Sequence, residues 1–336
     1  MTLNSIPAAD SNDMMQELSQ TAAQLHDAEA QLRRAIFGQD AVIRQSLAAI
    51  LAGGHVLLIG MPGVAKTKLV LALGQVLGLQ SKRIQCTPDL MPADILGTEV
   101  LEEGDHGKRN FRFIEGPVFC QLLMADEINR ASPRTQSALL QAMQEHAVTV
   151  AGGTRALPEP FHVLATQNPV DQEGTYPLPE AQLDRFLLQI DMPYPDRAAE
   201  RAMLIATTGS DEPTLTQCLT PETLRRAQQL VRRLPIGDKI VDGILNLVRQ
   251  ARPETTTDAF IKQNVTWGPG PRAAQALSLA ARARALLAGR ASPSMDDVLA
   301  LLPAALQHRL ALNFAARAEG VTMAAIFDRL RQSIAP

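Results

Sequence analysis

The stretch LLIGMPGVAKTKLVLALG, from Leu57 to Gly74, contains an almost complete phosphate-binding loop. The usual pattern is G-x-x-x-x-G-K-[ST], and Gly60, Lys66 and Thr67 occupy their expected places in it. In such a loop, backbone N–H groups surround the phosphates and the start of the next helix favours their charge. The sixth position should be glycine but is Ala65. We expect Ala65 to adopt a negative φ, where alanine is allowed, with its methyl group pointing away from the phosphates.

The whole chain has the composition of a globular protein. It has 336 residues, of which 46% are hydrophobic, so it is long enough for more than one domain. A net charge of −3 and 4% aromatic residues weigh against a nucleic-acid surface. The amino-terminal residues lack the pattern of a signal peptide, and no apolar run reaches the ~18 residues of a membrane span. Cys86, Cys120 and Cys218 are scattered, which favours reduced thiols in a cytoplasmic protein over a zinc site.

Short apolar runs alternate with helical patterns over the first part of the chain. The expected strands are HVLLIG, KRIQC, FCQLLMADE, FHVLATQNP and FLLQIDMP. This alternation predicts a parallel sheet with helices on both faces. After Pro193 and Pro195 such runs stop, and nearly everything has the pattern of helix. We therefore expect a helical segment over residues 1–35, an α/β core over 36–195 and a smaller helical domain over 196–336.

Polar residues follow two of the expected strands. Asp126 and Glu127 end one apolar run, where one carboxylate can hold Mg²⁺ and the next can polarise an attacking water molecule. The same pair could instead mark a helix amino terminus. Asn168 ends a further strand, where its amide could orient water, although a turn before Pro169 is an alternative.

Several other polar residues have ordinary structural interpretations. His55, His162 and His308 stand alone and are expected to be core or surface histidines. Asn129 and Arg130 follow the two carboxylates and could couple the site to a subunit interface, or could act as a cap and a salt bridge.

Taken together, these motifs resemble the AAA+ ATPases and, more narrowly, the MoxR family. The resemblance covers roughly residues 36–273 and is carried by IFGQD, GMPGVAKT, TPDLMPADILGTEV, GPVF, ADEINRASPRTQSALLQAMQE, ATQNPVDQEGTYPLPEAQLDRF and GPGPRA. It implies a P-loop parallel sheet followed by an all-helical lid. It also implies an insert in the second helix, at about 86–118, and a hairpin over 145–163. Loops of this family commonly have alanine before the lysine.

The resemblance also implies roles for individual residues. It assigns nucleotide contacts to Phe37, Gly38, Gln39, Gly60, Pro62, Gly63, Val64, Ala65, Lys66, Thr67 and Lys68. It assigns Mg²⁺ to Thr67 and Asp126, and catalytic roles to Glu127, Asn168, Arg185 and Arg272. Arg185 resembles the arginine finger that reaches a neighbouring subunit, although a salt bridge to Asp184 or Glu180 is the alternative. Arg272 resembles sensor 2.

The function implied is Mg²⁺-dependent ATP hydrolysis by a cytoplasmic ring of identical chains, a hexamer. Such rings remodel or mature partner proteins in a chaperone-like way, and the implied partner carries a von Willebrand factor A domain. Two other classes stay open. One is a metal-chelatase or nucleic-acid motor ATPase, and the other is a scaffold that binds ATP without hydrolysing it.

Overall fold

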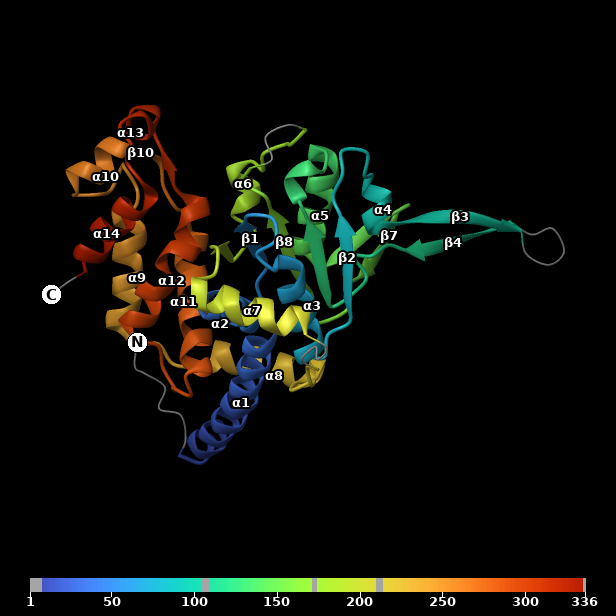
Figure 1. Cartoon of the computed structure of the whole chain (residues 1–336), viewed down its shortest axis with the longest axis horizontal. Coiled ribbons are helices and arrows are strands. Elements are labelled where there is room, and N and C mark those ends of the chain that lie inside the picture. Colours follow the sequence, from blue (N-terminus) through green and yellow to red (C-terminus); the bar gives the residue numbers. More distant parts are fainter. Residues whose placement is uncertain (1–7, 104–108, 171–173, 210–213, 335–336) are drawn as a thin grey trace.

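The computed structural model describes residues 8–103, 109–170, 174–209 and 214–334 (Figure 1). The predicted ranges 1–35, 86–118 and 196–336 therefore lie partly outside the described residues, as does one stretch of the motif that begins at Ala165.

A five-stranded parallel sheet forms the centre of the α/β part. Its strands are β1 (Val56–Gly60), β2 (Ser81–Gln85), β5 (Leu122–Asp126), β8 (His162–Gln167) and β9 (Leu188–Met192). Their order across the sheet is β2-β5-β8-β1-β9, and every neighbouring pair is parallel. All five coincide with stretches expected to be strands from the sequence, so the predicted parallel sheet is confirmed.

Both faces of the sheet are buried. Leu57 and Leu123 belong to one hydrophobic cluster, whereas Leu58 and Met124, each the next residue, belong to the other. Side chains alternate between the faces of a strand, so a strand buried on both faces is apolar at almost every position. This explains why the central strands β1, β5 and β8 are nearly continuous apolar runs, whereas the edge strands β2 and β9 contain polar residues.

Helices cover the two faces. The cluster that contains Leu58 and Met124 includes α1 (Ala8–Ala35), α2 (Asp40–Leu51) and α3 (Lys66–Val76). The cluster that contains Leu57 and Leu123 includes α5 (Pro133–Glu145). The cluster with Leu58 and Met124 also continues into the carboxyl-terminal helices, where α2 packs against α11.

The carboxyl-terminal part is mostly helical. It contains α7 (Arg197–Thr208), α8 (Pro221–Arg233), α9 (Asp238–Gln250), α10 (Ala259–Asn264), α11 (Pro271–Leu287), α12 (Met295–Leu306), α13 (Phe314–Ala318) and α14 (Met323–Gln332). The predicted helical domain is therefore confirmed, and its exception among the described residues is one short antiparallel pair, β10 (Val265–Trp267) with β11 (Ala311–Leu312). β-Branched and aromatic residues favour strand in β10, but the strand is too short to show a period.

Two hairpins leave the α/β body. After the short helix α4 (Pro92–Leu96), β3 (Gly97–Glu103) pairs with β4 (Arg109–Glu115), and this hairpin extends far to the right in Figure 1. β6 (Ala147–Val150) and β7 (Gly153–Ala156) form the second hairpin, which lies within the predicted 145–163 range. Among the described residues, no helix combines the length and the apolar character that a membrane span requires.

Two buried histidines connect the amino ends of β1 and β8. His55 Nδ1 accepts a hydrogen bond of 2.9 Å from the Val163 N–H, and its Nε2 donates to the Met143 carbonyl at 3.1 Å. His162 Nδ1 donates to the Gly54 carbonyl at 2.8 Å, while its Nε2 contacts the Gln228 amide nitrogen at 3.0 Å. Each ring therefore accepts at one nitrogen and must be neutral. Both are core histidines, as the sequence predicted. His55 does not stand alone, however, because its ring lies 6.1 Å from the ring of His146.

These histidines should make the protein less stable in acid. Burial lowers the pKa of His55 from 6.5 to about 3 and that of His162 to about 4, with a smaller contribution from neighbouring histidines. The unfolded chain therefore binds more protons below pH 6.5, and stability falls as the pH decreases. At pH 5 the free energy of unfolding should be about 2 kcal/mol lower for each ring than at neutral pH. Urea unfolding at pH 7.5 and pH 5 measures it.

His55→Gln and His162→Gln should each flatten this pH dependence, whereas His26→Gln, on the exposed side of α1, should not. If His55→Gln and the unmodified protein lose the same stability between the two pH values, His55 is not the titrating group.

Candidate functional site

The predicted site residues that follow β1, β5 and β8 meet at one edge of the sheet. In the parallel register, Ile59 lies opposite Gln167, and Ala125 lies opposite Ala165. The carboxyl ends of these three strands are therefore side by side, which is where open α/β sheets bind ligands. The phosphate-binding loop, the two carboxylates and Asn168 all emerge there.

The loop between β1 and α3 turns with two residues in the left-handed region. Gly63 has φ +85°, and a side chain there would meet nothing within 4 Å. Ala65 has φ 68° and ψ 27° and is the amino-terminal cap of α3. The prediction of a negative φ for Ala65 was therefore wrong. The chain must reverse from the strand into the helix while directing its N–H groups inward, and left-handed residues in a tight turn achieve this.

The left-handed conformation of Ala65 carries an energetic cost. The Cβ atom approaches the following carbonyl oxygen in this region, which costs roughly 1–2 kcal/mol for a residue other than glycine. Strained backbone of this kind is retained where the surrounding structure requires one conformation, typically at a binding site. Ala65 also packs its small side chain against the main hydrophobic cluster, which gives the methyl group a favourable environment.

Lys66 and Thr67 begin α3 directly after the loop. Lys66 Nζ donates to the Gly60 carbonyl and, at 3.2 Å, to the Met61 carbonyl. The side chain therefore folds back over the loop, and its ammonium group lies among the loop's own backbone atoms. A phosphate in the loop would be close to this cation and to the helix amino terminus together.

Asp126 is the last residue of β5 and is held from two sides. Its Oδ1 accepts a hydrogen bond from the Thr166 hydroxyl of β8, and its Oδ2 accepts one of 2.7 Å from Arg83 of β2. Its side chain is only 11% exposed. A carboxylate and the Thr67 hydroxyl on adjoining elements provide hard oxygen donors, which fit the chemistry of Mg²⁺.

Glu127 has an unusual backbone and a defined side-chain position. Its φ is 54°, and its N–H donates to the Thr166 hydroxyl at 2.9 Å. Its carboxylate accepts hydrogen bonds from Gln85 at 2.9 Å and from Arg130 at 3.1 Å. The structure thus gives Arg130 the salt-bridge role considered from sequence. Asn129 is buried, and its Oδ1 has no hydrogen-bond partner among the described residues.

Three polar residues around these carboxylates were missed in the sequence. Arg83 and Gln85 belong to β2, and Thr166 belongs to β8. Arg83 and Gln85 alternate with buried Ile84 along their strand, which places both on the side away from it. For Thr166 the sequence did contain a signal, because a polar residue inside an otherwise apolar strand indicates a buried hydrogen bond.

Asn168 is buried at the carboxyl end of β8. Its Oδ1 accepts a hydrogen bond of 3.2 Å from the Val170 N–H, which is a local turn around Pro169. The turn role considered from sequence is therefore present. The amide nitrogen makes no hydrogen bond within the described residues, so its two donors can serve a ligand at this edge.

A pocket of about 250 Å³ lies beside the phosphate-binding loop. Its lining combines the loop with the segment around Phe37 and Gln39, for which nucleotide contacts were predicted, and with α7: Ala35, Phe37, Gln39, Pro62, Gly63, Val64, Ala65, Lys68, Tyr194, Pro195, Glu200, Met203 and Thr207. Gln39 is buried and donates to the Pro193 carbonyl at 2.7 Å, which ties the segment before α2 to the end of the sheet. The arrangement provides an apolar cavity next to a phosphate cradle, as a nucleotide needs.

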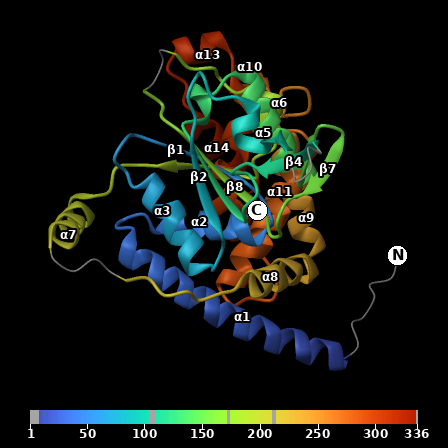
Figure 2. The ribbon, with the colours of Figure 1, turned by 90° about the vertical axis from the view of Figure 1, so that its right-hand side faces the viewer.

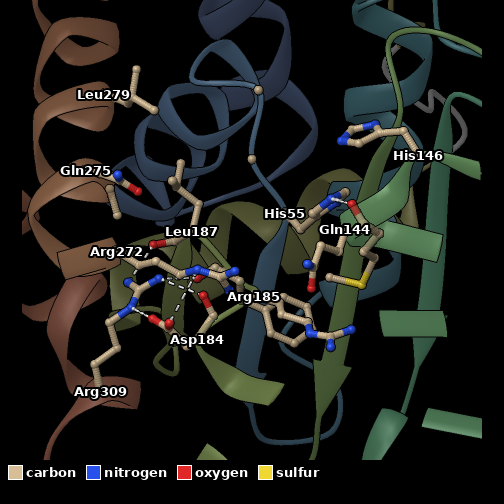
Figure 3. Close-up of a pocket in the computed structure, with 15 residues that line it drawn as sticks. His55, Gln144, His146, Asp184, Arg185, Leu187, Arg272, Gln275, Leu279 and Arg309 are labelled. Atoms are coloured by element: carbon tan, nitrogen blue, oxygen red, sulfur yellow. Dashed lines mark hydrogen bonds and ion pairs between the residues drawn. The ribbon is translucent and has the colours of Figure 1, made fainter. Parts of the chain in front are cut away.

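Arg185 and Arg272 lie together in a different pocket. Figure 3 shows this pocket, with Asp184 joined by dashed lines to Arg272 and Arg309. Arg272 Nε is 3.9 Å from one Asp184 oxygen, and Arg309 Nε is 2.6 Å from the other. Arg185 makes no ion pair within the described residues, so the alternative of a salt bridge to Asp184 or Glu180 is not observed.

The two arginines are far from the phosphate-binding loop of their own chain. Leu188, three residues after Arg185, starts β9 and lies opposite Val56 at the amino end of β1. The loop begins at the other end of β1, after Gly60. A strand of five residues spans roughly 15 Å, so Arg185 and the loop are at opposite edges of the sheet.

Arg309 is a third arginine in this pocket that the sequence did not indicate. Its side chain is 2% exposed, and it donates to Asp184 and to the carbonyls of Ala305, Phe186 and Leu187. These partners use the whole guanidinium group. Arg309 therefore fixes the segment that carries Arg185 to the helical part of the chain.

Comparisons with known proteins agree with this geometry. Residues 55–188 match the model of the ATPase family associated with various cellular activities (AAA), and residues 258–330 match the AAA lid domain. The chain is 41% identical to Chaperone MoxR1 of Mycobacterium tuberculosis over 94% of this chain and 83% of that protein. It is 32% identical to Protein MoxR of Methylorubrum extorquens over 84% of this chain and 86% of that protein. A crystal structure of a Cytophaga hutchinsonii protein called a "putative ATPase" matches with a TM-score of 0.88 and 33% identity, over 96% of this chain and 98% of that one.

The left-handed alanine gives a test of the loop geometry. Ala65→Gly should raise the free energy of unfolding by about 1 kcal/mol, because glycine adopts φ 68° without the Cβ contact. Ala65→Val should lower it. Ala23→Gly, at an exposed position inside α1, is the matched control and should lose about 1 kcal/mol. Denaturant unfolding measures all three, and a loss of stability in Ala65→Gly would contradict the conformation.

Proposed function

The chain belongs to the MoxR family of AAA+ ATPases, and from this premise we propose that it is a ring-forming enzyme that hydrolyses ATP with Mg²⁺. The observation that carries the proposal is the meeting of the phosphate-binding loop, Asp126, Glu127 and Asn168 at the carboxyl edge of one parallel sheet. We place the nucleotide base in the pocket formed by Phe37, the loop and α7.

Phosphoryl transfer to water depends mainly on positioning and on charge neutralisation. The loop N–H groups and Lys66 would bind the phosphates. Thr67 and Asp126 would hold Mg²⁺, which neutralises phosphate charge when bound. Glu127 would accept the proton of the attacking water molecule, and the Asn168 amide would orient that water. For this, Glu127 must exchange its contacts with Gln85 and Arg130 for a contact with water.

We propose that Arg185 and Arg272 act together on the nucleotide of a neighbouring subunit. Both lie in the pocket at the amino edge of the sheet, opposite their own loop. An arginine supplied in trans stabilises the charge of the transferred phosphoryl group. The Asp184 carboxylate, held by Arg309, would orient Arg272 in this pocket. The active site is then complete only between two copies of the chain.

The finer points of the proposal rest on family resemblance. The ring is proposed to be a hexamer that remodels or matures a client protein in the cytoplasm, and the client is proposed to carry a von Willebrand factor A domain. The name Chaperone MoxR1 of the mycobacterial relative supports the remodelling role. Three free cysteines support a reducing compartment. Co-purification with the native client would test this part directly.

Two substitutions should separate binding from chemistry. Lys66→Ala removes the cation that meets the phosphates, so tight ATP binding should be lost. Glu127→Gln keeps the shape and removes the base, so turnover should fall ~10²-fold or more while binding persists. A nucleotide titration beside a phosphate-release assay measures both. Near-normal turnover in Glu127→Gln would remove this residue from the mechanism.

The alternative of a nucleic-acid motor has its own test. Turnover of the unmodified protein that rises when DNA is added would favour a motor.

Arg185→Ala should leave nucleotide binding intact and reduce turnover by ~10³- to 10⁵-fold, the value of an arginine finger. Arg226→Ala, an exposed arginine of α8, is the control and should have no effect. Mixing the Arg185→Ala and Lys66→Ala proteins should restore part of the activity, because some interfaces then pair an intact loop with an intact finger. If the subunits exchange and the mixture stays inactive, Arg185 does not act in trans.

A further inference from the structure

Helix α7 borders the nucleotide pocket with one face and leaves the opposite face uncovered. Met203 and Thr207 line the pocket. On the other side, Leu204 is 60% and Ile205 is 57% exposed, and no residue of the helix is buried. Two large apolar side chains on a helix without a buried residue indicate a surface that another element covers. We define the outer face of α7 as Arg197, Arg201, Leu204, Ile205 and Thr208.

An open apolar groove lies between α8, α9 and α11. Its volume is about 630 Å³, and its lining consists of Arg232, Val241, Ile244, Leu245, Ala274, Gln275, Ser278 and Leu279. Val241 is 37% and Leu245 is 46% exposed there. Gln275 and Leu279 also line the pocket of Arg185 and Arg272, so the groove and that pocket are continuous. We call this surface the α9–α11 groove.

The outer face of α7 and the α9–α11 groove lie on opposite sides of the molecule. In Figure 2, α7 is at the far left of the ribbon and α9 is at the right. The two surfaces therefore cannot meet within one chain. Two surfaces of this kind on opposite sides can join copies of the chain head to tail, which is the contact that closes a ring.

We propose that the outer face of α7 docks in the α9–α11 groove of the next subunit. This inference rests on the proposed trans role of Arg185. If that arginine reaches a neighbour's phosphates, the neighbour's nucleotide pocket must face the arginine pocket. That nucleotide pocket is bordered by α7, and the arginine pocket is continuous with the groove. The neighbour's α7 is therefore brought to the groove.

The outer face of α7 carries basic residues, and α9 carries acidic residues beside the groove, whose lining also contains Arg232. Arg197 and Arg201 share the outer face of α7 with its two exposed apolar residues, as positions three and four apart do. Asp238 and Asp242 share the face of α9 with Val241 and Leu245 by the same spacing. None of these four charged residues makes an ion pair with another residue that the structure describes. Basic and acidic edges of this kind would fix the orientation of the helix in the groove.

Site-directed cross-linking tests the contact. Cys86 and Cys120 are buried, and Cys218→Ser provides the background. One protein carries Ile205→Cys and the other carries Leu245→Cys. With ATP and mild oxidation, their mixture should give a disulfide-linked dimer, whereas neither protein alone should. Phe314→Cys in place of Leu245→Cys is the control, because Phe314 of α13 is 82% exposed but lies outside the groove.

A charge exchange provides an independent readout. Arg197→Glu with Arg201→Glu should raise the protein concentration needed for half-maximal assembly by ~10-fold, measured by sedimentation with ATP. Adding Asp238→Lys and Asp242→Lys to the same chain should reverse this shift, because every interface would then contain both exchanged charges. A shift that the second pair of substitutions does not reverse contradicts the proposed pairing.

The outcomes distinguish this contact from the trans arginine. A specific cross-link without rescue in the Arg185→Ala and Lys66→Ala mixture supports the docking of α7 and rejects the arginine role. Rescue and assembly without the cross-link reject the docking and keep the arginine role. A dimer from Ile205→Cys protein alone indicates a symmetric contact between two α7 helices and overturns the proposal, as does a chain that stays monomeric with ATP.

Discussion

Parallel strands in one sheet all point the same way, and this direction determines where every functional group of the protein lies. The carboxyl ends of β1, β5 and β8 meet at one edge, so residues more than one hundred positions apart in the chain form a single site. The amino end of β9 lies at the opposite edge, and Arg185 precedes it. The phosphate-binding loop and the arginine are therefore separated by the length of a strand, and no rearrangement of side chains can join them within one chain.

The site at the carboxyl edge depends on two residues with left-handed backbones, Ala65 and Glu127. Neither is glycine, so both carry strain that the parallel sheet beneath them must support. At Ala65 the strain turns the loop into α3. At Glu127 it turns the chain out of β5, so that the N–H reaches Thr166 while the carboxylate is directed toward Gln85 and Arg130. The residues that bind phosphate and activate water thus have positions fixed by backbone geometry.

The sequence predicted the features that arise from local pattern. Continuous apolar runs indicated the three central strands β1, β5 and β8, because a strand buried on both faces needs apolar residues at almost every position. The conformation of Ala65 was not predictable in this way, since φ at a loop residue is set by the structure on both sides of it. The strand pair β10–β11 joins residues about 45 positions apart and is two or three residues long, so it has no local pattern. Arg83, Gln85 and Arg309 acquire their roles only through contacts made after folding.

The network around Asp184 explains how the two arginines of the proposed active site stay together. Arg309, which follows α12, is buried and binds Asp184 together with the Phe186 and Leu187 carbonyl groups. A buried arginine with all its donors satisfied forms a rigid connection, because breaking any one contact leaves a charged group without a partner. Arg272 on α11 shares Asp184, so the helical part and the sheet edge hold Arg185 and Arg272 in one pocket. The α9–α11 groove adjoins this pocket through α11. Because this connection is rigid, both arginines and the groove form one continuous surface, and in the proposed ring this surface faces the neighbouring nucleotide.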